Sequence, residues 1–206
     1  MKDFLSPRQA GIGISVYLEA IVHSTRRFIH NMPADHVVFK LEFSNAFNSL
    51  HRDYILRCVA DTIPESYTFC YTSYNVDSKL QFGDFIILSL VGPQQGDHLS
   101  ELLFCLGIHQ ILQYISSPFS AGLFHDIALG ANESVVTDIK LIKSKSCEIG
   151  LILNISKCKV INPLTVQFPT IPKFHSNSTS RRLLSRHTFK QWSIIGSGSR
   201  DSIQDA

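Results

Sequence analysis

Apolar residues recur along residues 14–161 with two different periods, one helical and one typical of strands. Helical spacing predicts amphipathic or buried helices, and short β-rich apolar runs predict strands. The helices are expected at residues 14–31, 46–62, 65–75, 98–115 and 132–148. The strands are expected at residues 36–43, at 79–91 as two segments around Gly83-Asp84, at 121–130 as a hairpin, and at 151–155 and 159–161. This order predicts an α+β fold, in which an antiparallel sheet carries helices on one face.

The periodic pattern ends at Pro163. Three prolines and eight serines occur between residues 163 and 202. A segment of this composition buries little apolar surface, so we expect a tail of low order at residues 163–206. The tail carries six Lys and Arg against two Asp, whereas residues 1–162 have a net charge of −2. Because the body is net acidic, broad binding of duplex nucleic acid is disfavoured there, and any basic surface belongs to the tail.

Length and composition indicate a globular protein. A chain of 206 residues, 44% of them hydrophobic, fits one domain, or one and a fragment, with a substantial core. No apolar run approaches the ~18 residues that span a bilayer, and the first residues, MKDFLSPRQAG, have no apolar signal core. We therefore expect an intracellular protein, in the cytoplasm or the nucleus, that is not secreted and has no membrane partner.

Cysteine and histidine spacing gives no zinc motif. The five cysteines are odd in number and contain no CxxC pair, and the nine histidines lack the spacing of zinc ligands. We interpret the cysteines as reduced thiols, most of them buried, in an intracellular protein. They are Cys58, Cys70, Cys105, Cys147 and Cys158.

Two acidic residues, Glu42 and Asp126, stand at the ends of predicted strands. Glu42 ends the strand 36–43, and Asp126 lies at the tip of the hairpin 121–130. Two carboxylates held close together supply the hard oxygen ligands that Mg²⁺ prefers. Two such ions about 3.5–4 Å apart stabilise the attacking and leaving oxygens of phosphoryl or nucleotidyl transfer. The alternative is that both acids are ordinary polar residues at strand ends.

Four segments resemble the ordered motifs of reverse transcriptases, the RNA-directed DNA polymerases. The segment LEFSNAFNSLHRD resembles motif A, and GPQQGDHLSELLFCLGIHQIL resembles motif B. The segment GLFHDIALG resembles the motif C hairpin, Tyr-x-Asp-Asp, and GLILNISKCKVI resembles motif D. Upstream, SPRQAGIGISVYLEAIVHSTRRF resembles the segment before motif A in non-LTR (LINE-like) retrotransposon polymerases.

This resemblance implies a polymerase palm with a ferredoxin-like antiparallel sheet at residues 36–162. A partial fingers segment would occupy residues 1–35, and a thumb is absent. The implied ancestral reaction is RNA-templated DNA synthesis by two-metal nucleotidyl transfer. Its partners would be an RNA template, a DNA primer and a deoxynucleoside triphosphate (dNTP), and its cofactor Mg²⁺ (or Mn²⁺). The oligomeric state is left open.

The resemblance also assigns roles to individual positions. The catalytic positions fall on Glu42, His125, Asp126 and Lys157, and the metal ligands among them are Glu42 and Asp126. Lys157 matches the motif D lysine that assists pyrophosphate departure as a proton donor. The nucleotide-binding positions are Phe43, Ser44, Asn45, Ala46, Phe47, Gln95 and Gly96. Among these, Phe47 matches the steric gate against a ribonucleotide 2′-hydroxyl.

Ordinary packing gives alternative explanations for several of these residues. Phe47 lies on the apolar face of its predicted helix, so core packing alone would account for it. Gly96 is also expected in a turn that needs a positive φ. Lys157 has the alternative explanation of an ordinary lysine on the solvent-exposed surface.

The sequence departs from the family pattern at the metal site. Glu42 stands where the family has Asp, which adds one methylene, and a shift of about 1 Å at a reacting centre can cost about 10²-fold. His125 stands at the first motif C aspartate, which removes a negative charge and offers a softer donor. We therefore expect a reverse transcriptase domain from a retroelement whose polymerase activity is impaired or lost. The alternative is a non-catalytic remnant that binds nucleic acid or another protein.

Overall fold

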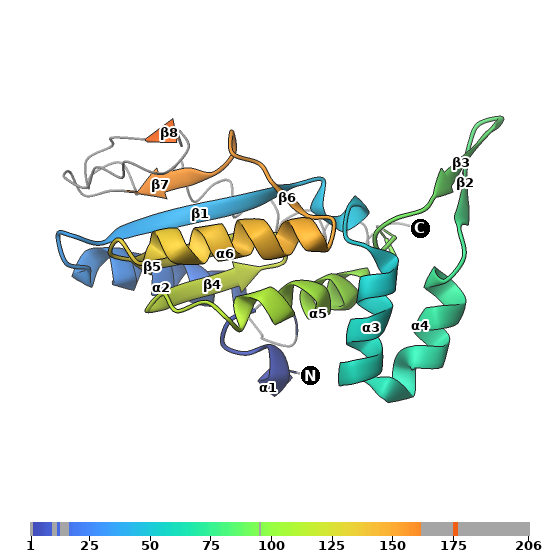
Figure 1. The fold of residues 1–206 in the computed structure, drawn as a ribbon, viewed down its shortest axis with the longest axis horizontal. Helices are drawn as coiled ribbons and strands as arrows, with labels where there is room; N and C mark the ends of the chain where they lie inside the picture. Colours follow the sequence, from blue (N-terminus) through green and yellow to red (C-terminus); the bar gives the residue numbers. More distant parts are fainter. Residues whose placement is uncertain (1, 10–11, 13–16, 95, 162–174, 177–206) are drawn as a thin grey trace, which may run out of the picture.

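A computed structural model of the chain describes residues 2–9, 12, 17–94, 96–161 and 175–176 (Figure 1). The helices are α1 (Lys2–Leu5), α2 (Tyr17–Asn31), α3 (Arg52–Thr62), α4 (Tyr67–Tyr74), α5 (Ser100–Leu112) and α6 (Val135–Glu148). Short 3₁₀ turns cover Ala46–Asn48 and Pro64–Ser66. The strands are β1 (Val37–Ser44), β2 (Ser78–Phe82), β3 (Phe85–Ser89), β4 (Phe119–Leu123), β5 (Asp126–Ala131), β6 (Ile152–Leu153), β7 (Lys159–Ile161) and β8 (His175–Ser176).

The main sheet is built around β1. Its order is β4-β5-β1-β7-β8, and β6 pairs with the end of β1. All pairs are antiparallel except β7 with β8. β1 occupies the centre because it is apolar on one face throughout and on both faces at its start, where Val37, Val38 and Phe39 are buried. The α+β fold expected from the sequence is confirmed.

The helices of the predicted palm cover one face of this sheet. Phe39, Leu41, Ile127 and Leu129 alternate toward that face and are buried in one cluster with residues of α3, α5 and α6. The contribution of α5 includes Leu103, Phe104, Leu106 and Ile108, all fully buried. Figure 1 shows α6 lying across the sheet on this side, with α2 behind it.

Helix α2 packs against part of the opposite face, through Phe28. The ring of Phe28 stacks on Phe119 of β4, with 4.8 Å between the ring centroids. It also lies over Gly130 of β5, where a Cβ atom would come within 2.3 Å of the ring. Gly130 therefore allows this close approach. The same helix contributes Ile21 to a small cluster with Ala121 and Leu123 of β4.

The two strands β2 and β3 form a separate hairpin that projects from the body (Figure 1). Their turn is Gly83-Asp84, as expected, and Gly83 has a φ of 59°. Arg52, at the start of α3, forms hydrogen bonds with the residues at the base of this hairpin. Its guanidinium donates hydrogen bonds to the carbonyls of Val76 and Gly92 and to the hydroxyl of Ser89, at 3.0–3.1 Å.

One predicted helix, at residues 46–62, is wrong in its first part. The chain makes a 3₁₀ turn at 46–48, becomes extended at His51, and starts α3 at Arg52. The cause is tertiary, because the backbone N–H of His51 donates to the carbonyl of Ile149 instead of continuing a helix. Gly150 permits this approach, since a Cβ there would lie 2.3 Å from the carbonyl oxygen of Ser49. The other predicted helices and strands agree within a few residues in the described part.

Several further expectations concern exposure. Four of the five cysteine thiols are buried, and Cys147 on α6 is exposed. Within the described residues, no helix combines the length and the apolar character needed to cross a membrane. The predicted tail, residues 163–206, lies outside the described residues apart from His175–Ser176, which pair with β7.

Candidate functional site

Glu42 and Asp126 lie directly opposite each other on the neighbouring strands β1 and β5. Residues paired in this way point their side chains to the same face of a sheet. Asp126 begins β5 directly after the hairpin turn and is only 3% exposed. The structure thus brings together the two carboxylates that the sequence suggested as a pair.

Two lysines hold this acid pair. The ammonium group of Lys157 lies 3.0 Å from Oε1 of Glu42. That of Lys40 lies 3.6 Å from Oε2 of Glu42 and 3.3 Å from Oδ1 of Asp126, so it bridges the two carboxylates. The side chain of Lys40 is largely buried, whereas that of Lys157 is mostly exposed. We call Lys40, Glu42, Asp126 and Lys157 the acid–lysine cluster.

The two carboxylates of the cluster differ in their affinity for protons. Burial raises the pKa of Glu42, but the hydrogen bond from Lys157 and the charge of Lys40 outweigh it, so the pKa lies below its usual value. Burial also raises the pKa of Asp126, and there it prevails over the opposing charge of Lys40. Glu42 is therefore the more readily ionised acid of the pair.

His125 occupies the turn between β4 and β5. Its ring lies edge-on to Phe47, with 6.2 Å between the ring centroids, and its Nδ1 is buried without a hydrogen-bond partner among the described residues. The preceding residue, Phe124, has a φ of 50°, which is rare for a bulky side chain. The side-chain amide of Gln9, from the N-terminal segment, forms hydrogen bonds with both the backbone N–H and the carbonyl of Phe124.

The segment predicted to face a nucleotide divides into buried and exposed residues. Phe43 and Ala46 are buried in the core, Ser44 pairs with Ile152 of β6, and Asn45 is exposed in a left-handed conformation. Phe47 is half-buried and stacks on Phe104 of α5, with 4.5 Å between ring centroids. Core packing therefore accounts for the position of Phe47, and its role as a steric gate stays a prediction.

The turn that resembles motif B in sequence is described in part. Gln95 lies outside the described residues. Gly96 has a φ of 90°, and an added Cβ would meet no atom within 4 Å. Its conformation, and not a lack of space, is therefore what favours glycine there. The carboxylate of the next residue, Asp97, accepts hydrogen bonds from the hydroxyl of Tyr74 and from the backbone N–H of Leu99. These two bonds stabilise the segment that precedes α5.

The donor set at the acid pair does not fit two divalent cations. Among the residues that the structure describes, no three His, Cys, Asp or Glu side chains are grouped closely enough to hold a metal ion. The two carboxylates are instead neutralised by the ammonium groups of Lys40 and Lys157. Mg²⁺ needs hard oxygen ligands, and His125 supplies none. As it stands, the cluster is an ion-pair network.

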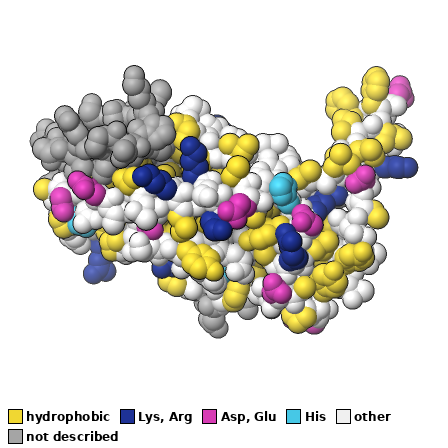
Figure 2. Space-filling view, viewed as in Figure 1, with side chains coloured by type: hydrophobic (Ala, Val, Ile, Leu, Met, Phe, Trp, Pro, Cys, Tyr) yellow, Lys and Arg dark blue, Asp and Glu magenta, His cyan; other side chains and the backbone are white. Residues whose placement is uncertain are grey.

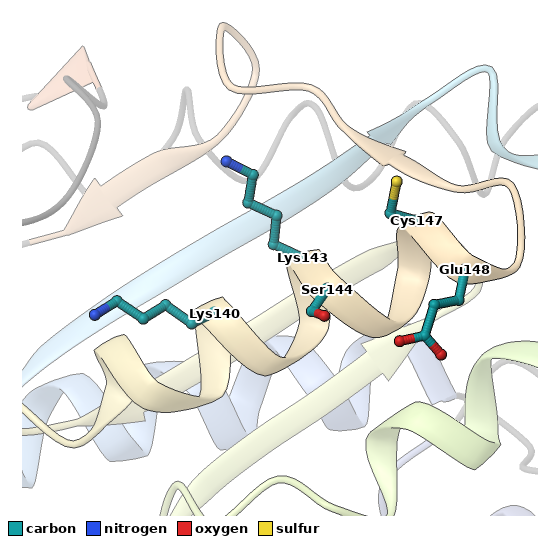
Figure 3. A pocket seen from close by; sticks show the side chains of 5 residues that line it. All are labelled: Lys140, Lys143, Ser144, Cys147 and Glu148. Carbon is teal, nitrogen blue, oxygen red and sulfur yellow. The ribbon is translucent and has the colours of Figure 1, made fainter.

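A shallow depression on α6 lies apart from the acid–lysine cluster. It has a volume of about 580 Å³ and is lined by Lys140, Lys143, Ser144, Cys147 and Glu148 (Figure 3). All five residues project from one helix, and that helix covers the sheet face opposite to α2. The depression is therefore a surface feature of α6 and contributes no residue to the acid pair.

Two residues of the site were missed by reasoning from the sequence. Lys40 stands two positions before Glu42, and alternate residues of a strand share a face, so the strand period alone would have placed them together. Gln9 is separated from Phe124 by 115 positions, and no local pattern links them.

Comparison with known proteins supports the fold. No protein-family model matches the sequence, and no curated protein matches it. Apo telomerase from Candida tropicalis matches with a TM-score of 0.56 and 10% identity, over 75% of this chain and 33% of that one. Telomerase from the same organism in complex with a TWJ fragment of telomeric RNA matches with a TM-score of 0.58 and 10% identity, over 77% and 31%. The chain therefore spans about a third of these telomerase chains and shares their fold over that part, which is consistent with a partial palm-like fold.

Proposed function

We propose that this chain is the palm of a reverse transcriptase of LINE-like retroelement origin, and that its own polymerase activity is impaired or lost. The ancestral reaction was addition of dNTPs to a DNA primer on an RNA template. The ordered motifs and the palm-like fold support the class of protein. An intracellular location is part of the same proposal.

The pairing of Glu42 with Asp126 is the observation that carries this proposal. Glu42, at the motif A position, and Asp126, at the second motif C position directly after a hairpin turn, lie opposite each other on facing strands, as the resemblance to the two motifs leads us to expect. In this chain, however, the ammonium groups of Lys40 and Lys157 neutralise both carboxylates. His125 stands at the position of the first motif C aspartate, so a further carboxylate is missing. The frame of the site is retained, whereas the charge that would attract Mg²⁺ or Mn²⁺ is reduced, so binding of either ion should be weak.

Primer extension on an RNA template, in Mg²⁺ and separately in Mn²⁺, tests the proposal. The unaltered chain should yield no more product than its Glu42→Ala variant. A double change, Glu42→Asp with His125→Asp, should raise the yield above both, because it restores the family's acids at the two altered positions. Extension by the unaltered chain at a rate lost in Glu42→Ala would show that the activity is intact and overturn the proposed impairment.

An RNA partner is the second element of the proposal. One of the similar structures is a telomerase bound to a fragment of telomeric RNA, which supports RNA as the ligand class for this fold. Binding to RNA should weaken steeply with salt, because phosphate contacts release counterions. Titration of a labelled RNA at several salt concentrations measures this slope, and a flat salt dependence would argue against an RNA partner.

A further inference from the structure

The β2–β3 hairpin carries one face that is wholly free of charge. Residues paired across the hairpin share a face, so Leu80, Phe82, Phe85 and Ile87 point to one side. Lys79 and Gln81 of β2 point to the other side, together with Ile86 and Leu88 of β3. We call the first set the apolar hairpin face. The alternation along β2 marks this face as the one suited to burial.

The apolar hairpin face is exposed in the structure. Phe82 and Phe85 are 74% and 73% exposed, and Leu80 and Ile87 are about half exposed. Figure 2 shows hydrophobic side chains gathered on the projecting arm, with an acidic side chain at its tip and basic side chains near its base. An isolated two-stranded hairpin is at best marginally stable in water, so a face of this kind needs a covering layer. Contiguous apolar patches on a protein surface mark interaction sites.

The base of the hairpin is held firmly, which fixes how this face is presented. Arg52 donates three hydrogen bonds to the chain on both sides of the hairpin, at Val76, Ser89 and Gly92. Its guanidinium also lies over the ring of Tyr74, 5.6 Å from the centroid. Arg52 therefore ties the chain on both sides of the hairpin to the start of α3.

We propose that the apolar hairpin face is the contact surface of a homodimer, in which the hairpins of two copies pack face to face about a two-fold axis. The face carries no charged side chain, so a second copy meets it without like-charge repulsion, while Lys79 and Gln81 of β2 stay in water on the other side. Two facing sheets pack about 10 Å apart with interdigitated side chains. Phe82 and Phe85 of each copy would fill the centre.

The size of the face suits a reversible dimer. A buried Phe side chain removes roughly 150–250 Å² from water. If the exposed parts of all eight side chains of two copies were buried completely, at most about 1,000 Å² would be removed from water, which is the threshold for a specific interface. Nucleic acid fits less well, because the face offers no positive charge to phosphate. The dimer is therefore expected to be concentration-dependent.

Sedimentation equilibrium of the full chain over a wide concentration range tests the proposal. The unaltered chain should show a monomer–dimer equilibrium. Replacing Phe82 and Phe85 together by Thr keeps the β propensity and should raise the dissociation constant at least about tenfold, as for the centre of an interface. The matched control replaces Ile86 and Leu88, on the other face of the hairpin, by Thr. It should change the dissociation constant of the dimer by less than about threefold.

Hydrogen exchange of the unaltered chain gives an independent readout that needs no variant. Amides of residues 80–87 should gain protection as the concentration rises. A chain that stays monomeric throughout would overturn the proposal, and so would equal weakening by both double changes. Open-ended growth beyond the dimer would exclude a closed two-fold contact as well.

Discussion

The side-chain amide of Gln9 holds the backbone of Phe124 from both sides. Its Oε1 accepts a hydrogen bond from the N–H of Phe124 at 3.2 Å, and its Nε2 donates to the carbonyl of the same residue at 3.4 Å. Gln9 is fully buried, and Phe124 has the positive φ that the turn demands. A residue near the N-terminus thus stabilises the turn from which Asp126 enters β5.

Replacing Gln9 by Ala should destabilise the chain by about 1–3 kcal/mol, because two buried backbone groups lose their partner. Urea denaturation followed by circular dichroism measures the change in the free energy of unfolding. The control is Gln113→Ala, at an exposed position at the end of α5, which should change it by less than about 0.5 kcal/mol. Equal effects of the two changes would contradict the proposed role of Gln9.

The contact of Gln9 illustrates what the sequence could and could not predict. The strand 36–43 was predictable because it is a short apolar run rich in residues that favour strands, and the hairpin 121–130 because two short apolar runs flank one polar pair. The pairing of Glu42 with Asp126 followed from their positions at strand ends. The clamp by Gln9 joins segments that are 115 positions apart, and such contacts have no local signature.

Two further features depended on tertiary contacts. The helix predicted from Ala46 does not form over its first residues, because the backbone N–H of His51 donates a hydrogen bond to the carbonyl of Ile149. No sequence pattern near His51 predicts this contact. The apolar run of β3, from Phe85 to Leu88, resembles a buried strand, yet both of its faces are exposed. Burial is set by the neighbouring layer, and a strand's own pattern shows only its suitability for burial.

Arg52 should be difficult to replace even by Lys. A lysine keeps the charge but cannot place three donors in a planar fork, so the carbonyls of Val76 and Gly92 would lose partners. We expect a loss of about 1–3 kcal/mol and faster tryptic cleavage after the exposed Lys79 in the loosened hairpin. The control is Arg57→Lys, whose partner Asp53 is also exposed. Cleavage at the same rate in both variants would refute this prediction.

Asp138 on α6 should make stability depend on acid pH. Burial raises its pKa, but hydrogen bonds from the hydroxyls and backbone N–H groups of Ser116 and Ser117 outweigh it and hold the pKa below its usual value. A lowered folded pKa means that the stabilisation is complete above the unfolded value, about 3.9, and is lost as the pH falls through the folded value.

The variant Asp138→Asn should therefore lose about 1.5–3 kcal/mol at neutral pH, the range for hydrogen bonds to a charged group. The difference from the unaltered chain should shrink as the pH falls below about 4. Urea denaturation at a series of pH values measures this difference. Asp77→Asn, at an exposed loop position, is the control and should change the free energy of unfolding by less than about 0.5 kcal/mol at neutral pH. A gap for Asp138→Asn that stays constant with pH would contradict the assignment.

Lys40 and Asp126 should be energetically coupled. Replacing Lys40 by Met removes the ammonium group that lies 3.3 Å from the buried carboxylate of Asp126, and an uncompensated buried charge costs about 3–5 kcal/mol. The folded pKa of Asp126 is already raised, so the loss should grow as the pH rises through that pKa and ionises the acid.

A double-mutant cycle isolates this coupling. Asp126→Asn removes the charge, so adding it to Lys40→Met should cost less than the two single changes summed, with a coupling of about 0.5–3 kcal/mol. Lys140→Met, at an exposed position on α6, is the control and should show no coupling to Asp126→Asn. Additive effects within the acid–lysine cluster would mean that the ammonium of Lys40 does not stabilise Asp126. Coupling would show that the ammonium of Lys40 stabilises the buried carboxylate of Asp126.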